Sequence, residues 1–191
     1  MNLHPALLRE IRNRKFEVAP NGLYLPKSKV LVAGMFGNQV RKATGELTPM
    51  QWSDNIIVNE GLNHILDVIF HAATQITTWY IAPFEGNYTP VATDTAANIT
   101  ANSTESTAYT ESTRVEYNEA AAASQSITNS ANKATFSINA TKTLYGAFLV
   151  SNSTKSATTG TLAAASRFSA SRAVVNTDQL LVTYTITAAD A

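Results

Sequence analysis

Apolar and polar residues alternate along the last third of the chain, which is the pattern of strands with one buried face. Residues 134–140 and 180–187 alternate in this way, and residues 162–168 repeat the pattern more weakly. Residues 144–150 are almost continuously apolar, as in a central strand. Clusters of turn-forming residues separate these segments, at 129–132, 151–160 and 176–178. The sequence therefore predicts an antiparallel β-sandwich or a jelly-roll-like pair of sheets.

Helical spacing appears in the segment from about residue 55 to residue 72. Its apolar positions recur every three or four residues, at Ile57, Leu62, Ile65, Leu66, Ile69 and Phe70. The preceding Ser53, Asp54 and Asn55 are good helix-capping residues. Gly61 weakens the helix slightly. We predict one long amphipathic helix here, lying well inside the body.

The first 45 residues have a different character from the rest. Residues 1–15 predict a short amphipathic helix, which is too short to be stable without a docking surface. An irregular extended stretch follows over residues 16–27. Residues 29–36 and 39–43 then predict a hairpin around the turn pair Gly37–Asn38. We therefore expect an extended N-terminal arm over residues 1–45 and a β-sandwich body over residues 46–191.

The middle of the chain carries two short strand signals around a long polar stretch. Residues 77–84 have strand composition, and residues 114–117 predict a short edge strand. The stretch between them, about 85–112, is unusually long for a loop in a compact domain. We expect it to wrap over a surface or to meet a neighbour. The fold class is mainly β (α+β).

Charge is scarce and unevenly distributed. Charged residues make up 15% of the chain, against roughly 25% in an ordinary protein, which suggests that part of the surface is hidden against a partner. Residues 1–50 hold eight Lys or Arg and three acids, so they carry +5, and the remainder carries −5. A basic arm of this kind suits an acidic partner surface. No dense run of Lys or Arg predicts binding to nucleic acid.

The sequence lacks the motifs that carry chemistry. It contains no cysteine, which excludes disulfides and thiol catalysis. It holds no nucleophile elbow and no glycine-rich phosphate loop. His64 and His71 are seven residues apart, whereas metal-binding pairs on helices are four apart. Asp54 and Glu60 are expected to cap and start the helix. We therefore predict a protein that is not an enzyme and has no cofactor, metal or catalytic residue.

Aromatic residues gather in the middle of the chain, at Trp79, Tyr80, Phe84, Tyr88, Tyr109 and Tyr117. Three interpretations stay open: a buried core, a protein interface, or a platform on which a carbohydrate stacks.

Two stretches of the sequence resemble small virion structural proteins of tailed bacteriophages. The resemblance covers about residues 55–188 and rests on an N-x-GLN-x-(I/L)LD helix, a TxWY strand, a Y-x-P-x-A-x-DT segment, a GAFLVS strand, a G-x-L-x-A-x-x-F segment and an L-x-V-x-Y-x-(I/F)-x-A end. In this chain these motifs are Asn59–Asp67, Thr77–Tyr80, Tyr88–Thr95, Gly146–Ser151, Gly160–Phe168 and Leu180–Ala188.

The resemblance implies a capsid decoration (cement) protein that binds the assembled head, bridges major capsid proteins and stabilises the shell. Such a protein would form a homo-oligomer, with dimer and trimer both compatible, on the capsid surface of the virion. The alternatives are a tail or head fibre or receptor-binding component that contacts host glycans, and a head–tail connector or tail subunit.

The N-terminus lacks the apolar centre of a signal peptide, and no apolar run approaches the roughly 20 residues of a membrane span. We therefore expect synthesis in the host bacterial cytoplasm and no membrane partner. The residues expected to contact a partner are Leu3, Leu7, Arg9, Ile11, Arg12, Arg14, Lys15, Lys27, Lys29, Tyr88 and Tyr109.

Overall fold

The computed structural model describes residues 16–18, 22, 24–26 and 30–190, which fall into two units. Residues 32–187 form the body. The other unit contains an antiparallel hairpin of β1 (Phe16–Val18) and β2 (Tyr24–Pro26). The boundary between the units lies at residue 31 rather than at residue 45, because residues 32–41 are part of a sheet of the body. The helix predicted over residues 1–15 lies outside the described residues.

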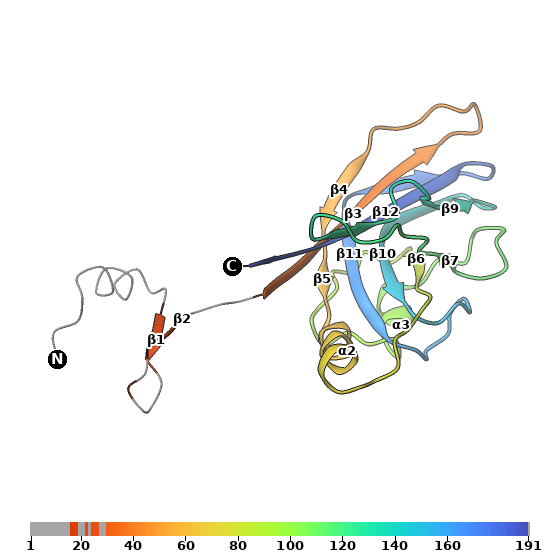
Figure 1. Ribbon diagram of the computed structural model, residues 1–191. Helices are drawn as coiled ribbons and strands as arrows, with labels where there is room; N and C mark the ends of the chain where they lie inside the picture. The colour runs from red at the N-terminus through yellow and green to blue at the C-terminus, as the bar shows by residue number, and fades with distance from the viewer. Residues whose placement is uncertain (1–15, 19–21, 23, 27–29, 191) are drawn as a thin grey trace. The chain divides into compact units, whose positions relative to one another are not determined.

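The body is a β-sandwich-like α+β fold with two antiparallel sheets, as the sequence predicts (Figure 1). The first sheet has the order β5-β11-β10-β6-β7, with β5 (Ile56–Ile57), β11 (Leu162–Val174), β10 (Lys142–Val150), β6 (Tyr80–Phe84) and β7 (Val115–Glu116). The second has the order β4-β3-β12-β8, with β4 (Gln51–Asp54), β3 (Val30–Arg41), β12 (Gln179–Asp190) and β8 (Ser126–Thr128); β9 (Ala134–Ser137) also pairs with β12.

The centre of the first sheet is buried on both faces. Its central strand is β10, the continuous apolar run, in which Leu149 faces the core between the sheets and Phe148 faces the opposite side. That opposite side is covered by the long polar stretch, which folds around α3 (Ile99–Ser103) and buries Ala96 and Ile99 against it. The stretch therefore wraps over a surface of its own body, and residues 115–116 form the predicted edge strand.

The core between the sheets is rich in aromatic rings. Phe36 of β3 stacks on Tyr184 of β12 with 4.2 Å between ring centroids, and Tyr109 meets Phe136 edge-on at 5.0 Å. The Tyr117 ring lies 5.9 Å from that of Tyr184. Burial raises the pKa of Tyr109, Tyr117 and Tyr184 above its ordinary value near 10. Of the aromatic residues singled out in the sequence, Tyr109 and Tyr117 lie in this core, so for them the interpretation as core is confirmed.

The hairpin predicted around Gly37–Asn38 is wrong, because both residues lie inside the single long strand β3 and pair with β4. Gly37 lies under the Trp52 ring instead: a Cβ at residue 37 would lie 2.9 Å from that ring, so a larger residue would push the ring outward. Asn38 is held by the guanidinium of Arg172, which binds both its side chain and its carbonyl. The chain turns later, around Gly45, where φ is +89°.

A buried ion pair fixes the long polar stretch to the loop that follows β10. The Arg114 guanidinium donates to Glu105 at 2.7 and 3.0 Å, and both side chains are only 1% exposed. The same guanidinium donates to the carbonyls of Asn152 and Ala157, so two loops close around one cation.

Asp178 organises the turn between β11 and β12. It is buried and accepts hydrogen bonds from Lys42 Nζ at 2.9 Å and from the N–H groups of Ala43 and Val175. Burial alone would raise the pKa of Asp178, but these hydrogen bonds and the Lys42 charge outweigh burial and hold it below the ordinary value. The carboxylate therefore joins the start of the β3–β4 loop to this turn.

We predict that Asp178→Asn lowers the free energy of unfolding by about 1–3 kcal/mol at neutral pH, because an amide cannot replace the charged acceptor. The lowered pKa means that the wild-type advantage is present above about pH 4 and disappears as the pH falls through the pKa of the folded state. Denaturant unfolding of both proteins between neutral and acidic pH measures this. Asp67→Asn, at an exposed helical acid, is the control and should change little; an Asp178→Asn effect that persists undiminished in acid contradicts the assignment.

Candidate interaction surfaces

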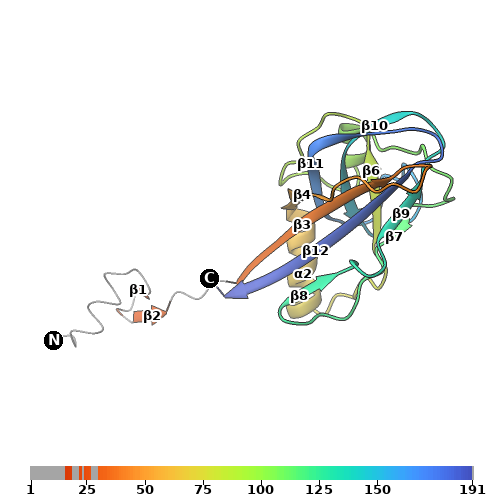
Figure 2. The same ribbon diagram turned by 90° about the horizontal axis from the view of Figure 1, so that it is seen from above.

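The predicted helix is α2 (Asn59–Phe70), and its first turn attaches it to the body beside β11 (Figures 1 and 2). The Val58 N–H donates to the Ala163 carbonyl at 3.2 Å, and the Asn59 N–H donates to the Ala92 carbonyl at 2.8 Å. Gly61 is buried against Ala163, where an added Cβ would lie 2.3 Å from the carbonyl oxygen. Only glycine lets the helix approach the strand this closely.

Glu60 strengthens the same attachment. Its Oε2 accepts the N–H of Leu162 at 2.8 Å and the N–H of Ala96 at 2.9 Å, so one carboxylate joins helix, strand and loop. The predicted cap at residues 53–55 is wrong, because those residues lie in β4 and in the crossing to β5. The N-cap is Val58, which makes no side-chain cap bond, and Asn55 instead donates to the Tyr184 hydroxyl at 2.8 Å.

Beyond its first turn α2 presents apolar side chains to the outside. Leu66 is 54% exposed, Ile69 63% and Phe70 79%. The prediction that this helix lies well inside the body is therefore wrong for its last two turns. A stripe of this kind normally faces a core or a partner. We call Leu62, Leu66, Ile69 and Phe70 the α2 surface.

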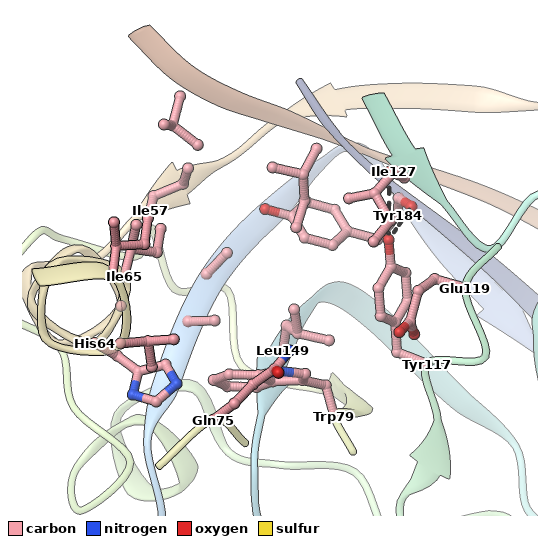
Figure 3. Close-up of a pocket in the computed structure, with 17 residues that line it drawn as sticks. Ile57, His64, Ile65, Gln75, Trp79, Tyr117, Glu119, Ile127, Leu149 and Tyr184 are labelled. Atoms are coloured by element: carbon pink, nitrogen blue, oxygen red, sulfur yellow. Dashed lines mark hydrogen bonds between the residues drawn. The ribbon is translucent and has the colours of Figure 1, made fainter. Parts of the chain in front are cut away.

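A pocket of about 300 Å³ lies between α2 and strands of both sheets, among them β10, β11 and β12 (Figure 3). A cavity of about 150 Å³ accepts a benzene-sized group, so this one has room for two such side chains. Ile65 and His64 lie on its helix side, and Leu149 and Trp79 lie across from them. Ile69 belongs both to this pocket and to the α2 surface, so the two are continuous.

The polar groups around the pocket are few and mostly fixed. The Tyr117 hydroxyl donates to the Tyr184 carbonyl at 3.1 Å, which holds the far wall together. His64 meets the Trp79 ring edge-on at 5.7 Å. Glu119 supplies the carboxylate of the lining, and no Lys or Arg contributes to the lining that the structure describes. The pocket is therefore apolar, with a single carboxylate in its described lining.

A second apolar surface lies on the outer side of the other sheet. Met35 and Trp52 are both exposed there, and a shallow cleft around them is lined by Ala33, Gly34, Asp54, Thr185 and Thr187. No segment of the described chain covers this side as the long polar stretch covers the first sheet. We call these residues the β3–β4 surface.

The partner residues predicted from the sequence have mixed outcomes. Tyr109 is only 2% exposed, so its prediction as a contact residue is wrong, because the ring packs in the core. Tyr88 is half-buried and donates to Asp94 at 2.8 Å within the body, so its hydroxyl is already engaged. Residues 1–15, Lys27 and Lys29 carry the remaining predicted contacts and lie outside the described residues.

Both surfaces were missed by sequence reasoning. The helical stripe was visible, but its period does not reveal what covers it. Met35 and Trp52 gave no signal, because isolated apolar residues on a strand usually face a core.

Within residues 30–190 and the described parts of the hairpin, no group of three His, Asp or Glu side chains is placed to hold a metal ion. Neither of the described helices, α2 and α3, is long and apolar enough to cross a membrane. No protein-family model matches the chain. No curated protein sequence matches it either.

We predict that Gly61→Ala destabilises the protein, although glycine-to-alanine changes inside helices normally stabilise by about 1 kcal/mol. The new Cβ would collide with the Ala163 backbone, which cannot move without disturbing β11. Thermal unfolding should show a loss of about 1–3 kcal/mol, the usual cost of overpacking. Asn63→Ala, on the exposed side of the same helix, is the matched control and should be neutral or slightly stabilising; equal effects of the two changes contradict the close approach.

Proposed function

We propose that this chain is a structural protein of a tailed-bacteriophage virion, a capsid decoration (cement) protein. It binds the outside of the assembled head, bridges neighbouring major capsid proteins and stabilises the shell as a homo-oligomer. Its place is the capsid surface.

The observation that carries the proposal is the pair of separate apolar surfaces on one small body, the α2 surface and the β3–β4 surface. A single apolar patch is sufficient for a dimer. Two separate patches let each subunit contact two different neighbours at once, which a bridging subunit on a shell must do.

The low charge of the chain supports the same role. With 15% charged residues and exposed side chains as large as Phe70 and Trp52, the free body presents more apolar surface than an isolated protein needs. A decoration protein is present in many copies, so a modest interface on each subunit adds up to a large total effect on the shell. The basic residues of the N-terminal arm add attraction to an acidic capsid exterior.

We expect the purified protein to sediment with heads assembled from the major capsid protein of the phage that encodes it. Met35→Asp should weaken this binding about tenfold or more. It removes an apolar side chain that head binding would bury, and such burial contributes about 1.5–3 kcal/mol. Leu47→Asp is the matched control, since Leu47 is exposed but lines neither surface, and it should bind as the wild type does.

An image of the whole particle is the second readout. Density for this protein at every capsomer is the expected result. Density confined to the tail, or binding of host glycans by the isolated protein in place of head binding, overturns the proposal in favour of a tail or fibre component.

A further inference from the structure

We propose that the edge of β3 at residues 32–34 binds an extended segment of a partner protein as an added β-strand. The inference deepens the proposed function and rests on it, because in a decoration protein the partner is the major capsid protein. Side chains of the added strand point alternately into the pocket beside α2 and into the cleft of the β3–β4 surface. The outer parts of both surfaces, with Phe70 and Trp52, stay exposed for other neighbours.

The edge is free because β4 accompanies only part of β3. Pairing runs from Asn38 with Gln51 to Met35 with Asp54, and the chain then leaves β3 and enters β5 of the other sheet (Figure 1). Residues 32–34 continue beyond this point, with β12 as the neighbour on their other side. No described strand pairs with them on the β4 side.

The backbone groups of Val32 and Gly34 point to this free edge. Successive residues of a strand direct their N–H and C=O groups to opposite edges, so residues two apart share an edge. Val40 faces the β4 side, since its N–H donates to the Thr48 hydroxyl and its carbonyl accepts the Thr48 N–H, both at 2.9 Å. The even-numbered residues of β3 therefore face this side, and those at 32 and 34 have no strand opposite them in the described body.

Apolar recesses lie on both sides of the same edge. Val32 lines the pocket beside α2 on the inner side, together with Ile57 and Ile65. Ala33 and Met35 line the cleft of the β3–β4 surface on the outer side. A strand laid along the edge places its successive side chains on these two sides in turn. The edge thus offers main-chain hydrogen bonds for affinity and recesses that select alternate apolar side chains, as β-strand addition requires.

The other described strands at sheet edges offer less. β5 and β7 are two residues long, and β8 is engaged by the Ala120 N–H, which donates to the Thr128 carbonyl at 3.0 Å. Proteins commonly protect a free edge with lysine or proline. Residues 32–35 are Val, Ala, Gly and Met, so the free part of β3 lacks both. Unpaired main-chain groups between apolar recesses favour an extended peptide as the occupant.

The test compares two substitutions at Val32 in the full-length chain. Val32→Pro removes the N–H that faces the free edge and keeps a side chain of similar size. Val32→Ala keeps that N–H but shortens the side chain. Gly34 is left unchanged, since a Cβ there would lie 2.7 Å from the Tyr184 hydroxyl oxygen. Thermal unfolding checks that both variants fold, because a strand tolerates proline where the missing N–H would face a free edge.

Head sedimentation should rank the variants by their main chain rather than by their side chain. Val32→Pro should bind heads about tenfold or more weakly than the wild type, since the lost N–H leaves a carbonyl of the partner segment unpaired. Val32→Ala should bind more tightly than Val32→Pro, although it has less apolar surface. Equal binding by the wild type and Val32→Pro, or the reverse order of the two variants, overturns the inference and leaves the proposed function standing.

Amide hydrogen exchange gives a second readout of the edge. The N–H groups of Val32 and Gly34 should exchange quickly in the free protein and slowly in the head-bound protein. The N–H of Ala33 faces β12 and should exchange slowly in both states. Fast exchange at Val32 and Gly34 in the head-bound protein contradicts strand addition.

An array of overlapping peptides from the virion proteins of the encoding phage identifies the partner. Binding of a major-capsid peptide by the wild type but not by Val32→Pro supports both claims. A bound peptide from another virion protein supports the added strand and removes the proposed function. Self-association of the wild type that Val32→Pro abolishes assigns the edge to a second copy and overturns the inference. Absence of any bound peptide together with absence of head binding overturns both claims.

Discussion

The close approach of Gly61 to the Ala163 backbone determines how α2 is held. Together with the Glu60 carboxylate and the Val58 N–H, it concentrates the attachment of the helix in its first turn. A helix fixed at one end and close to one strand can bury only a narrow side of itself. Its remaining apolar residues are therefore left at the surface, and the pocket between helix and sandwich stays open. The candidate site follows directly from this local constraint.

The two sheets differ because only the first has its centre covered on both faces. The long polar stretch folds over the first sheet and is tied down by Arg114, so β10 lies in a doubly buried position and can be continuously apolar. Nothing comparable covers the outer side of the second sheet within the described residues, so Met35 and Trp52 stay exposed there. One side of the body is thereby covered by its own chain, while the α2 surface and the β3–β4 surface expose apolar side chains. The proposed bridging role requires two such surfaces.

Sequence reasoning succeeded where local pattern and burial agree. Alternation over residues 180–187 and the run at residues 144–150 gave the right strands, because period two reports directly on a half-buried or central strand. It failed where distant contacts override local preference. The pair Gly37–Asn38 predicts a turn, yet Gly37 lies against the Trp52 ring and Asn38 accepts a hydrogen bond from Arg172. The Ser53–Asn55 cluster predicts a helix cap, yet Ser53 and Asp54 lie in β4 and Asn55 donates a hydrogen bond to the Tyr184 hydroxyl. Neither set of contacts can be predicted from the neighbouring residues in the sequence.

The candidate site shows the same limit more sharply. Helical spacing predicts an apolar stripe on α2 but is silent about whether a core, a neighbour or solvent lies opposite it. That question is decided by Gly61, a residue that looks only like a weakness in the helix until Ala163 is placed beside it.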